Sequence, residues 1–307
     1  MIEELRKYPS VYMIYDTNVE GFADGIAGEN DVEVSMGIEA GEDFKDMDAV
    51  LDICRFLLGV GADRDSLLLA VGGGTVSDTA GLAASLYKRG IRVAFVPTTL
   101  LSMVDAAYGG KNAVNLDGYK NIIGSFLQPE FVHRDISVLK TLPRREFVSG
   151  SAELLKAFLI GSETLYEEAV GVLSAEKMDW KALDRLIGEA VRIKEEIVAG
   201  DPFDKGDRHR LNLGHTFAHA IEWYERSTGV ADPMTHGEAV AAGIIRAAGM
   251  CDEALAVRLA EDFTACGLPV DIPYPMESLM PAMLGDKKNT EGQIRYVLLE
   301  KIGKVRI

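Results

Sequence analysis

The chain has 307 residues, of which 48% are hydrophobic, so it can form one large or two ordinary soluble globular domains. Its 32 basic and 48 acidic residues give a formal net charge of −16, which disfavours nucleic acid and anionic membranes as partners. The three widely spaced cysteines argue against a disulfide framework, and we see no signal peptide and no run of about 20 apolar residues, so we expect a cytoplasmic protein.

Strands and helices alternate through the first third of the chain. Short apolar runs predict strands at 11–15, 32–36, 67–71 and 91–96. Helices are predicted at 41–58 and 75–87. The run at 67–71 is apolar throughout, which is typical of a strand covered on both faces. The alternation therefore predicts a parallel sheet with helices on its faces.

A glycine turn, Gly72-Gly73-Gly74, connects the third strand to the helix that follows it. Such a turn lets the backbone approach a phosphate, and the helix N-terminus offers N–H groups to it. The spacing is not the G-x-G-x-x-G fingerprint, so a tight turn packed against a neighbour is an equally valid interpretation. Asp78 lies one turn into the helix, where a surface or capping role is the simple alternative to a ligand contact.

The segment 102–121 is long, polar and contains glycines. It brings several polar side chains close together in sequence, namely Asp105, Lys111, Asn115, Lys120 and Asn121. Apolar segments flank it on both sides and would anchor its ends in the core. We predict a functional loop, because long loops in compact domains tend to carry sites. The alternative is a solvated hairpin with its lysines in water.

The composition changes at residues 141–143, and the rest of the chain has a helical pattern. Helices are predicted over 144–161, 180–198, 215–226, 236–250 and 253–266, before a terminal hairpin over 293–299 and 303–307. The expected fold is an α/β, Rossmann-like N-terminal domain of residues 1–143 plus an all-α-dominated C-terminal domain of residues 144–307.

Histidines mark the second half as a possible metal-binding region. His215 and His219 lie four residues apart in RHRLNLGHTFAHAIE, so a helix places both imidazoles on one face. With His236 and Glu153 they offer candidates for a zinc set of two imidazoles and one carboxylate, which leaves the fourth position open for substrate or water. Spacing alone makes both His215 and His219 ligands. The alternatives are a core histidine in the helix and an ordinary ion pair of Glu153 with Lys156.

Seven motifs follow one another in a specific order: GGGTVSD, PTTLLSMVDAAYGGKNAVN, YKNIIGSFLQP, TLPRREFVSGSAELLK, RLNLGHTFAHAIE, HGEAVAAGI and DKKN. Together they resemble the 3-dehydroquinate synthase family over nearly the whole chain. The resemblance implies a carbon–oxygen lyase of the shikimate pathway. Its substrate would be an anionic sugar phosphate, 3-deoxy-D-arabino-heptulosonate 7-phosphate, and its products 3-dehydroquinate and phosphate. It also implies recycled NAD as cofactor and zinc or cobalt as the metal.

The resemblance assigns roles to individual residues. It implies Glu153, His215 and His236 as metal ligands, and it moves His219 to substrate binding and proton transfer. The other implied substrate contacts and catalytic residues are Asp105, Lys111, Asn121, Lys156, Lys194, Arg208, Asn212 and Lys287. The implied NAD contacts are Asp16, Asn18, Glu42, Lys45, Gly73, Gly74, Asp78, Thr98, Thr99, Lys111, Lys120, Thr141 and Glu146. Residues 1–143 would thus bind NAD, and residues 144–307 would bind metal and substrate. In an expected homodimer, Arg89 would reach the neighbouring subunit's site.

Three residues depart from the family pattern beside these positions. Asn112 replaces the Thr or Ser after GGK, Ala218 replaces the Gly of GHTFGH, and Pro202 interrupts the DExExGxR pattern. Three other functions stay open from the sequence. They are another sugar-phosphate cyclase, a metal-dependent polyol dehydrogenase that forms net NADH, and a binding protein without catalysis.

Overall fold

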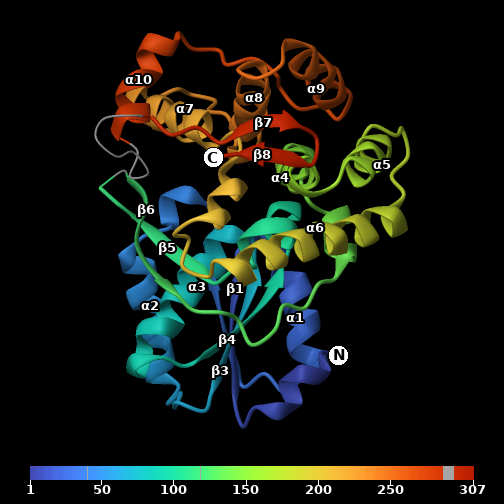
Figure 1. The fold of residues 1–307 in the computed structure, drawn as a ribbon. Coiled ribbons are helices and arrows are strands. Elements are labelled where there is room, and N and C mark those ends of the chain that lie inside the picture. The colour runs from blue at the N-terminus through green and yellow to red at the C-terminus, as the bar shows by residue number, and fades with distance from the viewer. Residues whose placement is uncertain (40, 118, 286–293) are drawn as a thin grey trace. The chain divides into compact units, whose positions relative to one another are not determined.

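The computed structural model describes residues 1–39, 41–117, 119–285 and 294–307. The chain forms two compact units, Met1–Leu142 and Pro143–Ile307, which are described separately below (Figure 1). Lys287 and the first residue of the predicted terminal hairpin lie outside the described residues.

The N-terminal unit is built on a four-stranded parallel sheet, as predicted. Its strands, in the order β2-β1-β3-β4, are β2 (Val34–Ile38), β1 (Val11–Asp16), β3 (Leu67–Gly72) and β4 (Arg92–Pro97). All residues of β3 are buried, because helices cover both faces of the sheet (Figure 1).

Alternate residues of the strands supply two separate cores. Tyr12, Leu68 and Phe95 face one side, with α2 (Met47–Gly59) and α3 (Gly74–Leu86). Met13, Leu69 and Val96 face the other side, with α1 (Glu20–Glu29), a helix that the sequence pattern did not reveal. This period-two division of apolar side chains fixes the register of the sheet.

The helix predicted over 41–58 begins later than expected. The segment Glu42–Phe44 forms only a 3-10 turn, and α2 starts at Met47. Asp46 is the reason, since its side chain accepts a hydrogen bond from the Ala49 N–H at 2.9 Å and so caps the helix there.

The predicted loop at 102–121 is largely a hairpin, as the alternative interpretation had it, whereas the function of the segment stays a prediction. A π-type turn at Ser102–Ala106 leads to the antiparallel strands β5 (Lys111–Leu116) and β6 (Tyr119–Phe126). Asn112, one of the three departures, is buried and donates to the carbonyls of Gly110 and Leu127. Its side chain fills the place where Gly81 of α3 has no Cβ, since a Cβ there would lie 2.0 Å from Asn112 Oδ1.

The C-terminal unit is mainly helical, as predicted. Its elements are α4 (Arg144–Gly161), α5 (Glu163–Leu173), α6 (Trp180–Gly200), α7 (His215–Thr228), α8 (His236–Gly249), α9 (Glu253–Ala265), α10 (Met276–Gly285), β7 (Leu298–Lys301) and β8 (Lys304–Arg306). Helix α4 is buried continuously from Phe147 to Ile160, which makes it the central helix of this unit. Ala218, the second departure, is fully buried on α7.

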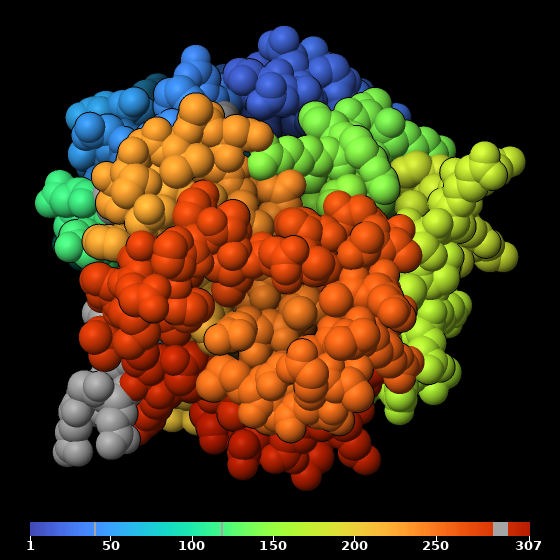
Figure 2. Space-filling view, turned by 90° about the horizontal axis from the view of Figure 1, so that it is seen from above, coloured from blue at the N-terminus to red at the C-terminus, as the bar shows by residue number. Residues whose placement is uncertain are grey.

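Figure 2 shows the outer face of the C-terminal unit, coloured orange to red, where its later helices supply most of the surface. Single apolar side chains such as Met250, Val257 and Leu284 are about half exposed on this unit, as is ordinary for a globular protein. Within the described ranges, none of the helices combines the length and apolar character needed to cross a membrane.

Candidate active site

Three side chains of the C-terminal unit converge on one point. Glu153 comes from the middle of α4, and His215 and His236 are the first residues of α7 and α8. Their ligand atoms all lie within 4.8 Å of one another. Glu153 Oε1 is 3.8 Å from His215 Nε2 and 3.5 Å from His236 Nε2. The structure therefore gathers the three residues that the family resemblance assigns to the metal.

His219 does not belong to this group, so the hypothesis based on spacing alone was wrong. Its ring lies edge-on to the ring of His215, with the centroids 5.3 Å apart. The ligand atoms that converge within 4.8 Å among the described residues belong to Glu153, His215 and His236 and do not include those of His219. It lies beside the cluster, where it can contact a molecule bound there.

Glu153 fits a metal ligand better than a structural ion pair. Both of its carboxylate oxygens are buried, and the two imidazole nitrogens that face Oε1 lie at 3.5 and 3.8 Å, beyond the usual length of a hydrogen bond. Lys156 Nζ lies 2.5 Å from Oε2, so an ion pair with Lys156 exists, but it leaves Oε1 facing the two imidazoles. Two imidazole nitrogens and one carboxylate oxygen are a donor set that suits zinc or cobalt.

The electrostatics of His236 also favour a cation at this point. Burial by itself lowers the pKa of His236, but the carboxylates of Glu222 and Glu153 outweigh burial and raise it to about 10. The two acids thus stabilise positive charge at the imidazole, whether a proton or a metal ion supplies it.

Each ligand histidine has a second contact through its other ring nitrogen. His215 Nδ1 is 3.2 Å from the carbonyl oxygen of Leu213, and His236 Nδ1 is 3.0 Å from Glu222 Oε1. Sequence reasoning missed Glu222. The available signal was its position seven residues after His215, which places both on one face of a helix.

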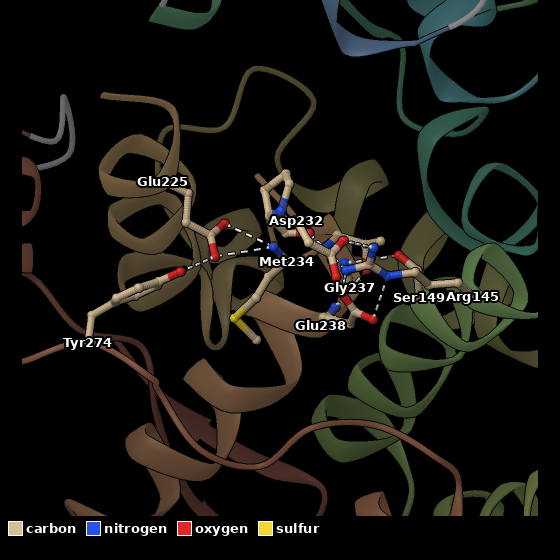
Figure 3. Close-up of polar contacts among 10 residues, drawn as sticks. Arg145, Ser149, Glu225, Asp232, Met234, Gly237, Glu238 and Tyr274 are labelled. Atoms are coloured by element: carbon tan, nitrogen blue, oxygen red, sulfur yellow. Dashed lines mark hydrogen bonds and ion pairs between the residues drawn. The ribbon is translucent and has the colours of Figure 1, made fainter. Parts of the chain in front are cut away.

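Hydrogen bonds from other helices fix the connection between α7 and α8, which ends where α8 begins at His236 (Figure 3). On one side, Arg145 donates hydrogen bonds to Asp232, to the carbonyl of Pro233 and to Glu238. Burial would raise the pKa of Glu238, but Arg145 lowers it below its usual value. The capping box of Thr235 and Glu238 then starts α8 at His236.

The second attachment is Glu225, a buried residue of α7. Its carboxylate accepts hydrogen bonds from the Met234 N–H and from the Tyr274 hydroxyl, the latter at 2.7 Å (Figure 3). Burial and the neighbouring Glu225 raise the pKa of Tyr274 to about 12, so its hydroxyl stays a donor. The Gly237 N–H adds a third contact by donating to Ser149 Oγ on α4. Sequence reasoning missed these contacts, because they join residues far apart in the chain.

Three cations of this unit, Lys156, Lys194 and Arg208, are buried although the chain is acidic overall. Arg208 Nη1 donates to the carbonyl oxygen of Pro202 at 2.9 Å, so the third departure contributes a backbone contact. Buried cations are rare in proteins without a partner or a ligand.

The turn before Arg208 is organised by Asp201. Its carboxylate accepts hydrogen bonds from the N–H groups of Lys205, Gly206 and Arg208. These backbone donors lower the pKa of Asp201. Asn212, another predicted substrate contact, ends the 3-10 helix Asp207–Asn212 that follows.

In the N-terminal unit, predicted cofactor residues lie where the parallel strands end. Asp16 ends β1, Gly73 follows β3, and Thr98 follows β4. Asp16 accepts hydrogen bonds from the backbone and side chain of Asn18. Gly73 is the N-cap of α3, where no side chain caps the helix. Carboxyl ends of adjacent parallel strands form the edge at which open α/β sheets bind ligands.

A buried charged pair lies at the start of α3. Lys45 Nζ is 2.6 Å from Asp78 Oδ2 and donates to Asn121 Oδ1 at 2.7 Å. Burial raises the pKa of Asp78 to about 6, although Lys45 opposes the shift. The simple surface or capping role for Asp78 is therefore wrong.

A second polar contact lies on the β5–β6 hairpin. Asn115 Nδ2 donates to Glu42 Oε1 at 2.8 Å, and Lys120 Nζ is 3.9 Å from the same oxygen. Asn121 has a positive φ of 53°, an uncommon conformation that is concentrated at functional sites. The unit thus brings Glu42, Lys45, Asp78, Lys120 and Asn121 into two linked contacts.

The remaining predicted residues are distributed over both units. Asp105 belongs to the π-type turn, Lys111 begins β5 with an exposed side chain, and Thr99 hydrogen-bonds with Ser102. Thr141 donates to the carbonyl of Val138 in the N-terminal unit. Glu146 lies in the first turn of α4, and so in the C-terminal unit.

The parallel sheet and the helical unit with its Glu–His–His group define the two-unit fold of sugar-phosphate cyclases. A 2-deoxy-scyllo-inosose synthase, solved with carbaglucose-6-phosphate, NAD+ and Co2+, has a TM-score of 0.85 and 29% identity, covering 98% of this chain and 85% of its own. A 2-epi-5-epi-valiolone synthase from Streptomyces hygroscopicus, solved with NAD+ and Zn2+, has a TM-score of 0.88 and 27% identity, covering 98% and 87%.

The family itself follows from sequence comparison. The domain described as 3-dehydroquinate synthase N-terminal matches residues 35–149, and the one described as 3-dehydroquinate synthase C-terminal matches residues 150–289. A 3-dehydroquinate synthase of Cereibacter sphaeroides is 37% identical over 99% of this chain and 86% of its own length. The chain belongs to the 3-dehydroquinate synthase family, as its motifs predicted.

Proposed function

We propose that this chain converts 3-deoxy-D-arabino-heptulosonate 7-phosphate to 3-dehydroquinate and phosphate, a step of the shikimate pathway that leads to chorismate and aromatic amino acids. The observation that carries the proposal is the group of Glu153, His215 and His236 in a chain of this family. The reaction is that of a carbon–oxygen lyase with no net oxidation.

Zinc or cobalt would be held by Glu153, His215 and His236, and when bound it supplies Lewis acidity to a substrate hydroxyl. Asp16, Gly73 and Thr98 at the strand ends would hold NAD, which would supply reversible hydride-transfer chemistry. The two structural neighbours solved with NAD+ and with Co2+ or Zn2+ support these assignments.

The chain's own residues would bind the substrate and move protons. Lys156, Lys194 and Arg208 are buried cations that can hold a carboxylate or a phosphate by charge-assisted hydrogen bonds. His219 lies beside the proposed metal ligands, where its imidazole could carry a proton to or from a bound molecule. In the N-terminal unit, Lys111 and Asn121 would add substrate contacts and Lys120 a contact near the nicotinamide.

One incubation tests the proposal. Zinc-loaded protein, catalytic NAD and the heptulosonate phosphate are mixed, phosphate and dehydroquinate are quantified, and the NADH absorbance is followed. Equal amounts of phosphate and dehydroquinate without lasting NADH are expected. Net NADH without phosphate would instead indicate a polyol dehydrogenase. Absence of turnover with this substrate, but turnover of another sugar phosphate, would indicate a different cyclase.

We also infer a cytoplasmic homodimer in which Arg89 approaches the partner's site. Lys88 and Arg89 both have positive φ, at 49° and 70°, directly after α3. Lys88 is held within the chain, because its Nζ donates to the carbonyl oxygen of Ala62 at 2.6 Å, so the inference for Arg89 rests on the family resemblance. Light scattering of the purified protein measures the mass, and a monomer at micromolar concentration would contradict this inference.

A further inference from the structure

Glu222 is a buried carboxylate that the proposed reaction does not use. It lies on α7 and shares a helical face with His215 and His219. Its side chain is 6% exposed, and its Oε1 lies 3.0 Å from His236 Nδ1. A buried acid aimed at the non-ligating nitrogen of a ligand histidine needs an explanation.

The contact determines which nitrogen of His236 can bind a metal ion. An ionised carboxylate only accepts hydrogen bonds, so the Nδ1 atom beside Glu222 must carry the hydrogen. When a metal ion replaces the other ring proton, the lone pair that binds it is then on Nε2, the atom that faces Glu153 Oε1 at 3.5 Å. The Leu213 carbonyl has the same relation to His215 Nδ1. Both imidazoles are thereby prepared to use Nε2.

The two rings differ in how firmly their surroundings hold them. The side chain of His215 is 11% exposed, whereas that of His236 is 31% exposed. The capping box of α8 fixes the backbone of His236 but leaves rotation about its side-chain bonds undetermined. A hydrogen-bond acceptor that fixes the ring orientation is therefore more important for His236 than for His215.

We propose that Glu222 is a positioning residue for the metal ligand His236. It selects the tautomer, orients the ring and increases the basicity of Nε2, as carboxylates do behind many metal-bound histidines. This inference rests on the metal site of the proposed function, and it adds a residue on which metal affinity depends.

The test measures metal binding directly. Zinc affinity is determined by competition with a chromophoric chelator, and the visible spectrum of the Co2+-loaded protein reports ligand geometry. Glu222→Ala is expected to weaken zinc binding roughly 10- to 100-fold and to alter the cobalt spectrum. Glu222→Gln keeps the volume and an accepting oxygen, so its affinity should fall between those of Glu222→Ala and the unmodified chain.

Glu225→Gln is the matched control. Glu225 is a similarly buried acid on the same helix, but it binds the Met234 N–H and Tyr274 rather than a ligand histidine. Its replacement should lower the melting temperature and leave the zinc affinity and cobalt spectrum near those of the unmodified chain.

Two results would overturn the inference while leaving the metal site intact. One is a Glu222→Gln or Glu222→Ala protein that binds zinc as tightly as the unmodified chain with an unchanged cobalt spectrum. The other is an equal loss of zinc affinity in Glu225→Gln, which would indicate general loosening of α7. If the unmodified chain binds neither zinc nor cobalt, the proposed function fails, and this inference fails with it.

Discussion

The two units build their sites in different ways. In the C-terminal unit, Glu153, His215 and His236 come from three helices and converge on one point, each imidazole held through its second nitrogen. In the N-terminal unit, the polar residues follow strand ends in a row, and the buried charge of Lys45 already faces Asp78. Convergence suits a small cation, whereas an extended edge suits a long ligand such as a dinucleotide.

The two units also differ in whether their buried charged groups face an open position that a ligand could occupy. Lys156 pairs with Glu153 Oε2, whereas Glu153 Oε1 faces the Nε2 atoms of His236 and His215 at 3.5 and 3.8 Å, where a metal ion would join the three side chains. In the N-terminal unit, Lys45 already pairs with Asp78 and donates to Asn121, so a ligand there would join an existing contact. Changes in the first site should therefore abolish function, and changes in the second should mainly alter stability and affinity.

The largest expected effect is at the convergent site. His215→Ala should remove zinc and lower the turnover rate by at least about 1,000-fold, since the metal contributes several kcal/mol to the chemistry. Elemental analysis and the phosphate assay measure both. His133→Ala, outside the ligand group, serves as the control. Stoichiometric zinc in His215→Ala would refute the ligand assignment.

His219→Ala should separate chemistry from metal binding within the same unit. It is expected to retain zinc, because His219 lies outside the ligand group, and to lose roughly 100- to 10,000-fold in turnover as a proton carrier is removed. Loss of zinc equal to that of His215→Ala would show that the two neighbouring histidines act together in the metal site.

The variant Asp78→Asn tests the Lys45–Asp78 pair through the pH dependence of the free energy of unfolding. The pKa of Asp78 is raised to about 6 in the folded chain, so as pH rises the unfolded chain loses this proton before the folded chain does. The contribution of protonated Asp78 to the free energy of unfolding is therefore full below the unfolded pKa and is lost as pH rises through about 6. The stability of Asp78→Asn relative to the unmodified chain should therefore rise by up to about 3 kcal/mol between pH 3.5 and pH 7. Urea unfolding at several pH values measures it. A difference that does not change with pH would show that burial does not dominate at Asp78.

The smallest effect is expected at the attachment of the α7–α8 connection. Tyr274→Phe removes one donor from the buried Glu225 carboxylate, which keeps its bond from the Met234 N–H. The expected loss is about 1 to 2 kcal/mol of unfolding free energy with zinc affinity preserved. Thermal unfolding and chelator competition measure the two quantities, and a large loss of zinc would mean that this attachment controls His236 directly.

The same contrast explains what the sequence could predict. The strand ends with Asp16 and Gly73 follow from local apolar runs, and the motifs placed Glu153, His215 and His236 together. The start of α2 was predicted too early, because apolar periodicity does not locate a cap such as Asp46.

Other features depended on contacts between distant segments. The spacing of His215 and His219 indicated a shared helical face, but it could not show which of the two lies next to Glu153 and His236. Likewise, nothing local joins Arg145 to Glu238, or Glu222 to His236, before the helices pack. Side-chain contacts between helices are set by tertiary structure, so pattern reasoning does not reach them.

The close approach of Gly237 to Ser149 limits which substitutions the candidate metal site can tolerate. The Gly237 N–H meets Ser149 Oγ, and a Cβ at residue 237 would lie 1.8 Å from the Ser149 carbonyl oxygen. Any substitution there would push α8 away from α4, and His236 is the adjacent residue. The glycine, which carries no functional group, has to be copied unchanged into any descendant or design that keeps the histidine.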